Sequence, residues 1–486
     1  MKKVLLVYPG RLYAPIWGYE VWNLKPVLLN LFSYLSQEPR LEIDVLDFEV
    51  ELGNPAREEE VDKFKNKVNR ALKGRCFDIV AISCYLSTNY LSTKMIAEMC
   101  RKINGTSTIV VGGHHPSVVP DDFLYKNSPF DFIVLGEGEE ALLKICKGDI
   151  EKSGRPRIIQ GTALNLRKSF PLKLKEFKYS SYKPVYRVGF ELSRGCVFNC
   201  SYCPKIVVGT CWRAYSLKDS IKKIEEAIDS LNPVEIGFMD PCFGFNKFWR
   251  RSLLKEIIRS KIDKVFWASP RIELLEPEDI DLFARLNFRL LISLESGSEK
   301  ILGIMERTKY PKEYLKKCKA IIDYINRKKI PNDLFVILNH PGENLYTFEE
   351  SLRYVESLAE NRKDISTKVN FTPYYILPGT PAYRKLKYFE RKYGTYVKYK
   401  EWWKDSSHDQ YKLATDVVAS GELKDINPYL IFKDEIVRLR HLLMSKLSKE
   451  RMSFNFVLQK IPGGENENEK LPFNHNMNIP EFLFKR

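Results

Sequence analysis

The chain has 486 residues, of which 44% are hydrophobic and 29% are charged, and its formal net charge is +16. This length predicts more than one domain, and the apolar fraction is sufficient for sizeable cores, which excludes a disordered chain. Because Lys and Arg are dispersed among Asp and Glu, and no RNA-reading module or basic tail is visible, we interpret the charge as a solvated surface. A nucleic-acid partner is therefore not expected, while an anionic lipid surface or a phosphate-bearing substrate is an open alternative.

The sequence predicts a cytoplasmic protein that is at most peripheral to a membrane. The ten cysteines are unevenly distributed, which indicates a reducing compartment rather than a disulfide framework. The apolar run near the N-terminus stops at Pro9-Gly10, too early for a signal peptide, and is typical of a first β-strand. No apolar stretch approaches the length needed to cross a bilayer, so a transmembrane segment is not expected.

Residues 1–150 alternate predicted strands with helices, which indicates a doubly wound, Rossmann-like or flavodoxin-like parallel sheet. The expected strands cover residues 3–8, 42–47, 78–83, 108–112 and 132–135. Such sheets bind ligands beyond the carboxyl ends of their strands, and two exits here are rich in glycine. They are Val110-Val111-Gly112-Gly113-His114-His115-Pro116 and Leu135-Gly136-Glu137-Gly138-Glu139-Glu140. Glycine admits close approach of a ligand to the backbone, although tight turns in any flavodoxin-like domain have a similar composition.

Residues 151–184 are expected to form a linker, and residues 185–381 a second α/β domain. Its strands are predicted at residues 187–193, 234–240, 265–268, 290–295, 334–338 and 369–375, with helices near 216–231, 247–260, 277–287, 311–328 and 347–361. Ser216 with Asp219 three residues on resembles a capping box at the start of the first of these helices. Six strand–helix units predict a partial (β/α)6 barrel of the TIM-like kind.

Residues 382–486 form an α-rich C-terminal region with many Lys and aromatic residues. We expect it to pack against the open side of the barrel, and a wall that caps the substrate is the alternative. Within it, residues 463–478 predict a disordered polar tail.

The most informative motif is C-x3-C-x2-C, formed by Cys196, Cys200 and Cys203. Three thiolates can hold a four-iron cluster and leave one iron open for chemistry. The alternative is a structural zinc site, but zinc ligands usually come as two separated pairs, and no His lies near this stretch. Cys211 falls outside the motif and is interpreted as a buried or incidental thiol.

Polar residues follow several barrel strands, where the chemistry of barrels gathers. Asp240 follows the second strand, Glu295 ends the fourth, and Arg271 comes just after the third. A guanidinium such as that of Arg271 can bind a carboxylate in fork geometry. Each of these residues also fits an ordinary loop or surface position. Cys242, beside Asp240, either touches substrate or packs.

The cysteine motif, with Tyr202 before its third Cys, resembles the radical S-adenosylmethionine (radical SAM) superfamily. The resemblance implies a [4Fe-4S] cluster on the three cysteines, whose open iron is chelated by SAM, and a 5'-deoxyadenosyl radical formed on one-electron reduction. It also implies that the backbone of Tyr202 faces the adenine, Asp240 meets the SAM amine, Glu295 approaches the ribose and Arg271 pairs with the SAM carboxylate.

The first third of the chain is similar to the cobalamin-binding domain of B12-dependent radical SAM proteins. The resemblance implies that five residues line the corrin or its nucleotide tail: Ser83, Gly112, Gly113, Gly136 and Gly138. The Asp-x-His-x-x-Gly motif that supplies an axial His to cobalt in other cobalamin proteins is absent. His114 and His115 are interpreted as turn residues rather than cobalt ligands.

The resemblance implies cobalamin-dependent methylation of an unactivated carbon, or of phosphorus, in a small molecule, lipid or peptide. A reducing electron donor of the flavodoxin or ferredoxin type would be required. The alternatives are cobalamin-independent radical cyclisation, C–C coupling or rearrangement. A tRNA methylthiotransferase is less consistent with the sequence, since Cys76, Cys84, Cys100 and Cys146 lack a ligand-like grouping and no RNA-binding module is seen. A non-catalytic corrinoid or iron–sulfur carrier would not need an open cluster iron in a barrel.

Overall fold

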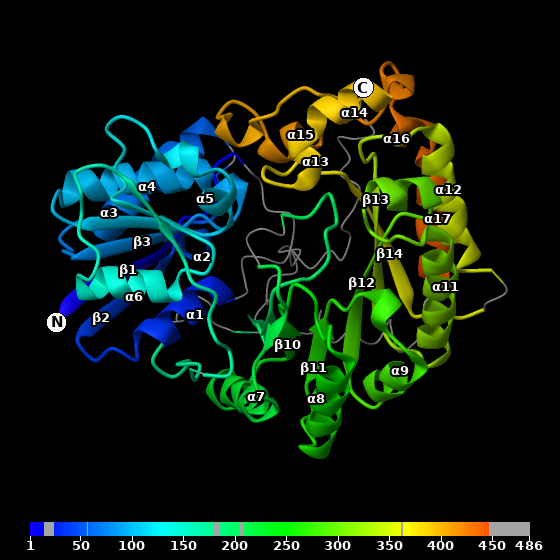
Figure 1. Ribbon diagram of the computed structural model, residues 1–486, viewed down its shortest axis with the longest axis horizontal. Coiled ribbons are helices and arrows are strands. Elements are labelled where there is room, and N and C mark those ends of the chain that lie inside the picture. The colour runs from blue at the N-terminus through cyan, green and yellow to red at the C-terminus, as the bar shows by residue number, and fades with distance from the viewer. Residues whose placement is uncertain are drawn as a thin grey trace, which may run out of the picture.

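Two six-stranded parallel sheets form the frame of the molecule (Figure 1). The computed structural model describes residues 1–13, 24–55, 57–168, 170–177, 185, 187–204, 209–360 and 363–446. Residues 463–478, where the sequence predicts a polar tail, lie outside these ranges. No helix among the described residues is long and apolar enough to span a bilayer.

The N-terminal sheet has the strand order β2-β1-β3-β4-β5-β6, and all its pairs are parallel. Its strands are β1 (Lys2–Tyr8), β2 (Leu41–Asp47), β3 (Ile79–Ser83), β4 (Thr108–Gly112), β5 (Phe132–Leu135) and β6 (Arg157–Gln160). Continuous apolar runs make the central strands, as expected for a sheet covered on both faces. The chain order reverses beside β1, which is where doubly wound sheets place their ligand crevice.

Helices cover both faces of this sheet (Figure 1). They are α1 (Pro26–Leu35), α2 (Phe48–Leu52), α3 (Glu58–Leu72), α4 (Tyr90–Ile103), α5 (His114–Val118) and α6 (Glu139–Lys147). The apolar residues of α3 recur at helical spacing and are buried, namely Val61, Phe64, Val68 and Leu72. The predicted doubly wound domain is confirmed.

The second sheet has the order β14-β13-β12-β11-β10-β7 and is parallel throughout. Its strands are β7 (Arg187–Phe190), β10 (Glu235–Phe238), β11 (Val265–Ala268), β12 (Phe288–Glu295), β13 (Asn332–Leu338) and β14 (Thr367–Pro373). The helices between them are α7 (Leu217–Leu231), α8 (Lys247–Arg259), α9 (Pro277–Ala284), α10 (Glu299–Ile304), α11 (Pro311–Arg327) and α12 (Leu345–Ser357). The six strand–helix units confirm the partial barrel. Ser216 caps α7 by accepting a hydrogen bond from the Asp219 N–H at 3.1 Å.

Two short antiparallel pairs and a set of small helices complete the described chain. The pairs are β8 (Ser193–Arg194) with β9 (Arg213–Ala214), and β15 (Tyr396–Val397) with β16 (Val417–Val418). The helices are α13 (Pro381–Arg384), α14 (Leu386–Tyr393), α15 (Gln410–Thr415), α16 (Pro428–Ile431) and α17 (Lys433–Ser445). Figure 1 shows the C-terminal region, in yellow to orange, crossing from the barrel towards the N-terminal domain.

Two features differ from the sequence-based expectation. Strand β6 lies inside residues 151–184, which the sequence assigned to a linker, because an exposed edge strand of four residues carries little hydrophobic signal. The aromatic residues Trp402 and Trp403 pack in one core with the N-terminal domain as well as against the barrel end. The C-terminal region therefore bridges the two domains in addition to covering the barrel.

Candidate active site

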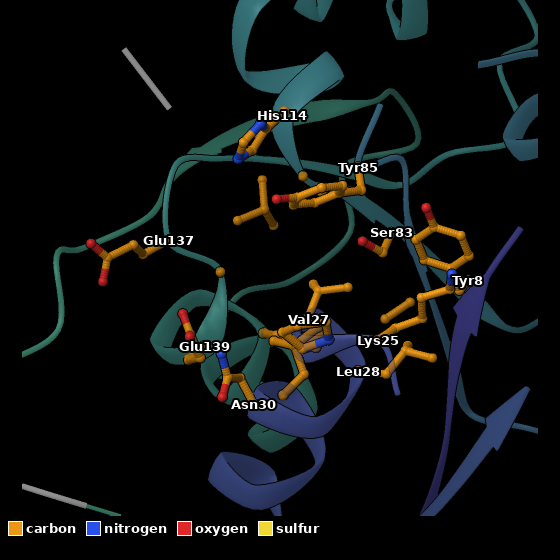
Figure 2. A pocket seen from close by; sticks show the side chains of 18 of the residues that line it. Tyr8, Lys25, Val27, Leu28, Asn30, Ser83, Tyr85, His114, Glu137 and Glu139 are labelled. Carbon is orange, nitrogen blue, oxygen red and sulfur yellow. The ribbon is translucent and has the colours of Figure 1, made fainter. Parts of the chain in front are cut away.

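A cavity of about 320 Å³ opens where the carboxyl ends of the two sheets meet. On the N-terminal side it is lined by the exits of β1, β3, β4 and β5 and by α1 (Figure 2). On the barrel side it is lined by Glu191, Arg194, Gly195, Met239 and Pro241. The five residues that the resemblance assigned to a corrin all line it, namely Ser83, Gly112, Gly113, Gly136 and Gly138.

The backbone at these exits requires glycine at two positions. Gly113 has φ +113°, and a Cβ there would lie 2.6 Å from the carbonyl oxygen of Cys84. Gly136 has φ +77°, in the left-handed region that side chains disfavour. At Gly112 and Gly138 neither the φ angle nor a close contact requires glycine. The lack of a side chain at these two positions leaves more space along the cavity wall. The glycine-rich turns thus keep the cavity wide at the sheet edge.

The polar side chains of the cavity differ in whether they have a protein partner. The Ser83 hydroxyl is buried and has no protein hydrogen-bond partner among the described residues, and Figure 2 shows Ser83 beside the cavity. A buried hydroxyl without a partner is costly, which fits a bound group with polar atoms. Lys25 lies 4.8 Å from the centroid of the Tyr8 ring and pairs with the buried Glu49. Burial alone would raise the pKa of Glu49, but Lys25 and Arg11 outweigh it and lower the pKa to about 2.

The two neighbouring histidines have different surroundings. His114 lines the cavity with its ring 4.6 Å from that of Tyr85, and burial lowers its pKa to about 4 (Figure 2). His115 points the other way, and its Nε2 lies 3.0 Å from Asp122. Both residues belong to the first turn of α5, so they lie in a helix rather than in a connecting turn. That neither histidine ligates cobalt stays a prediction.

The cysteine loop lies between β8 and β9, on the barrel side of the cavity. Cys200 is buried, and Cys196 and Cys203 are half-buried. Burial raises the pKa of Cys203 to about 12, and the other two motif cysteines add to this effect through their proximity. Among the described residues no three His, Cys, Asp or Glu side chains gather closely enough to hold a metal ion. In number and kind, the three cysteine thiols fit a four-iron cluster with one open iron.

Arg271 lies directly against this loop. Its Nη1 donates to the Cys200 sulfur at 3.2 Å, and its guanidinium carbon is 3.6 Å from the centroid of the Phe198 ring. Its Nε donates to Glu273 at 2.6 Å, which fixes the plane of the guanidinium. The structure thus brings the predicted carboxylate-binding residue to the motif cysteines.

Glu295 and Tyr202 form a second contact at the barrel mouth. The Tyr202 hydroxyl donates to Glu295 Oε1 at 2.8 Å. Burial raises the pKa of Glu295, and the nearby Arg307 and the Tyr202 hydrogen bond oppose this. Glu295 has φ +76°, which is uncommon for a residue other than glycine and is costly unless the surroundings impose it. Such positions cluster at functional sites.

Asp240 and the remaining cysteines take other positions. Asp240 is buried, accepts from the Leu192 N–H at 2.8 Å and from the Ser193 hydroxyl, and so ties the exits of β10 and β7 together. Its contact with a SAM amine stays a prediction. Cys242 is buried and hydrogen-bonds with Cys196, which together with burial raises the pKa of Cys242. Cys211 is exposed, so the interpretation of a buried thiol is wrong and that of an incidental thiol stays a prediction.

The sequence did not predict the ion-pair cluster on the cavity wall between the two domains. Arg194, two residues before Cys196, pairs with Glu137, Glu139 and Glu191. Glu191 lies three residues before Arg194, whereas Glu137 and Glu139 stand out in the sequence only as part of a glycine-rich stretch. Because their partner follows more than fifty residues later, no local pattern could have joined them.

Two family models match the chain. Residues 28–145 match the B12 binding domain, and residues 190–355 match the radical SAM superfamily. The matched ranges contain both cavity-lining glycine turns and the cysteine motif.

Several curated proteins are similar to the chain. It is 26% identical over 228 residues to tRNA-2-methylthio-N(6)-dimethylallyladenosine synthase of Sulfurihydrogenibium sp., covering 45% of this chain and 48% of the relative. It is 27% identical over 215 residues to an uncharacterized methyltransferase of Pyrococcus horikoshii, covering 40% and 46%. It is 23% identical over 337 residues to anaerobic magnesium-protoporphyrin IX monomethyl ester cyclase of Cereibacter sphaeroides, covering 64% and 53%. These matches span about half the length of the curated relatives.

Solved structures resemble the whole architecture. The radical SAM methyltransferase TsrM of Kitasatospora setae, with cobalamin and a [4Fe-4S] cluster bound, has a TM-score of 0.67 at 15% identity, covering 90% of this chain and 91% of that chain. The cobalamin-dependent radical enzyme OxsB, with aqua-cobalamin bound, has a TM-score of 0.65 at 16% identity, covering 90% and 67%. At these identities the likeness shows the fold.

Proposed function

Because the chain is a radical SAM protein with an N-terminal B12-binding domain, we propose that it is a cobalamin-dependent methyltransferase. The acceptor is an unactivated carbon, or phosphorus, of a small molecule, lipid or peptide. The observation that carries the proposal is the cavity at the sheet edge, whose wall includes Arg194 and Gly195, the residues directly before the first motif cysteine. A corrin in this cavity would lie beside the SAM site, as methyl transfer between the two requires.

The chain's own residues would bind and orient the cofactors. When bound, the cluster with SAM supplies a radical that removes hydrogen from the substrate, and cobalamin supplies the methyl group. Cys196, Cys200 and Cys203 would hold the cluster. Ser83 and the four glycines at the sheet edge would contact the corrin or its nucleotide tail.

Three barrel residues would position SAM and limit its motion. Arg271, already held by Phe198 and Glu273, would present its guanidinium to the SAM carboxylate. Glu295, held by Tyr202, would accept hydrogen bonds from the ribose. Asp240 would act on the amine. A flavodoxin or ferredoxin type of donor would supply the electron.

The test is the corrinoid and iron content of protein purified without oxygen from cells supplied with cobalamin. We expect about one corrinoid and about four irons per chain, and transfer of labelled methyl from SAM to the product. As a control, Cys200→Ala should lose the iron and SAM cleavage but keep the corrinoid, because Cys200 does not line the cavity and the five proposed corrin contacts belong to the N-terminal domain. Iron without corrinoid, even after reconstitution, would refute the methyl-transfer proposal.

A second candidate is a radical cyclisation or rearrangement without methyl transfer. It is favoured by the similarity to the magnesium-protoporphyrin ester cyclase, which covers 64% of this chain. In that case the N-terminal domain would serve the fold or bind a cofactor that does not donate methyl. Product that carries no label from methyl-labelled SAM, formed together with 5'-deoxyadenosine, would support this candidate.

A further inference from the structure

Arg194 is the centre of a buried ion-pair cluster that joins the two domains. Its side chain is 8% exposed, and its guanidinium lies 3.0 Å from Glu137, 2.7 Å from Glu139 and 2.8 Å from Glu191. Glu137 lies in the turn after β5, Glu139 is the first residue of α6, and Arg194 belongs to β8 of the barrel domain. All of these residues line the cavity. One side chain thus connects the cavity wall of one domain to the cysteine loop of the other.

The turn that carries Glu137 is also held by contacts other than Arg194. Glu137 accepts a hydrogen bond from the Leu164 N–H at 2.9 Å and pairs with Arg213 of β9. Gly161 packs so tightly that a Cβ there would lie 1.9 Å from the Glu137 carbonyl oxygen. The turn therefore has little room to shift without disturbing β6 and the segment after it.

On the barrel side, close backbone contacts couple the position of Arg194 to that of the first motif cysteine. Arg194 pairs with Arg213 in the β8–β9 ribbon. The next residue, Gly195, has φ +86° and approaches Cys211 so closely that a Cβ would lie 2.0 Å from its carbonyl oxygen. Cys196 follows and donates its N–H to Gly209 at 3.1 Å. A shift of Arg194 would consequently move Cys196 as well.

The charges of the ion-pair cluster explain why a cation is needed at the position of Arg194. Three carboxylates face Arg194, and Arg213 is a second cation that contacts Glu137. Burial alone would raise the pKa of Glu137, but Arg213 and Arg194 outweigh it and lower the pKa. Removing one member of a buried pair leaves an uncompensated charge, which favours separation of the two surfaces. Lys could retain the charge but not the planar fork that reaches several carboxylates.

We propose that Arg194 is a positioning residue that sets the separation between the cavity and the cysteine loop. Through Glu137 and Glu139 it fixes the corrin-binding turn against the loop that holds the cluster. The role rests on the proposed function, because the separation matters for chemistry only when a corrin fills the cavity. Small misplacements of reacting groups are costly in catalysis, so a rigid connection at this point has a clear use.

The test measures the separation itself by pulsed electron paramagnetic resonance between nitroxide labels on Cys76 and Cys211. These two thiols are exposed, one in each domain, and the motif cysteines are protected when the cluster is bound. In cluster-loaded wild-type protein we expect a single narrow distance distribution. Arg194→Ala should broaden or lengthen it, and Arg194→Lys should restore it only in part. No corrinoid or substrate is needed, so the result does not depend on the proposed methyl transfer.

The matched control is Arg251→Ala. Arg251 also pairs with three carboxylates, of Glu276, Glu278 and Asp279, but all of them belong to the barrel domain. This variant should keep the wild-type distribution. Where Arg194→Ala fails to fold, the double variant Glu137→Gln, Glu139→Gln tests the same contacts from the other side. A distribution in the folded Arg194 or Glu137/Glu139 variant equal to that of Arg251→Ala would overturn the proposal.

Discussion

Glu295 illustrates how single residues of the site are fixed by contacts distant in sequence. It ends β12 after an irregularity in the pairing with β13, takes a left-handed φ and receives the Tyr202 hydroxyl. Its place at the end of a barrel strand identified Glu295 as a candidate, but its contact with Tyr202 spans 93 residues and has no local signal. Asp240 shows the opposite case. The sequence selected it for the same reason, but the fold uses both of its carboxylate oxygens for hydrogen bonds that join two loops.

Asp240 should make the stability of the protein depend on pH. Burial raises its pKa to about 7, although hydrogen bonds from Ser193 and Leu192 oppose this. A carboxyl whose pKa is raised by folding stabilises the folded state fully below its unfolded pKa, and this contribution is lost as pH rises towards 7. We expect Asp240→Asn to remove this loss, which amounts to at most about 4 kcal/mol. Urea unfolding of both proteins between about pH 4 and about pH 7.5 measures it.

The test compares the unfolding free energy of wild type and of Asp240→Asn as a function of pH, because other buried carboxyl groups also titrate in this range. Glu343, for example, has a pKa raised to about 8 by burial, and it is unchanged in the variant. The difference in unfolding free energy between wild type and Asp240→Asn should therefore decline as pH rises. Parallel curves over the whole range would show that the Asp240 carboxyl does not titrate as its burial implies.

At the scale of helices and strands, hydrophobic periodicity was sufficient for most of the fold. Continuous apolar runs predicted five of the six strands in the first sheet and all six in the barrel, while the short exposed β6 was missed. The glycine-rich exits were predicted because glycines that follow a strand can be read from neighbouring residues in the sequence. The cluster around Arg194 was not, since it joins strand exits of two domains, and only the tertiary structure places them together.

The glycines at the strand exits should separate effects on folding from effects on ligand binding. At Gly113 a methyl group would meet the Cys84 carbonyl at 2.6 Å in a strained backbone, so Gly113→Ala should destabilise the fold by about 2 kcal/mol or more. At Gly138 the nearest atom would lie 3.8 Å away, so Gly138→Ala should change stability by less than about 0.5 kcal/mol. It should nevertheless reduce corrinoid content, because the methyl group enters the cavity wall.

Gly303→Ala in α10 provides the control for both changes, because a methyl group there meets nothing within 4 Å. It should leave the corrinoid content unchanged and stabilise the helix by roughly 0.5 kcal/mol. Chemical unfolding and the corrinoid absorbance of purified protein measure the two quantities. Gly138→Ala protein with wild-type corrinoid content would argue against a corrin at this wall.

At the scale of the whole molecule, the C-terminal region holds the two domains together around the site. Trp403 donates its indole N–H to Asp122 at 2.7 Å, and Asp122 also binds His115 and Lys404. Gly379, after the last barrel strand, packs against Val118 of α5, where a Cβ would lie 2.4 Å from the Val118 Cβ. These contacts pack the C-terminal region against α5, the helix whose first residue is the cavity-lining His114.

Trp403→Phe should therefore loosen the cavity as well as destabilise the protein. It keeps most of the apolar volume but removes the donor to buried Asp122, at a cost of about 1–3 kcal/mol. Trp402→Phe is a matched change, because Trp402 is equally buried but donates to the Ile376 carbonyl at 2.7 Å, outside the N-terminal domain. Both variants should lose similar stability in urea, whereas only Trp403→Phe should release corrinoid faster on gel filtration. Equal corrinoid loss from the two variants would mean that the C-terminal region stabilises the fold without acting on the cavity.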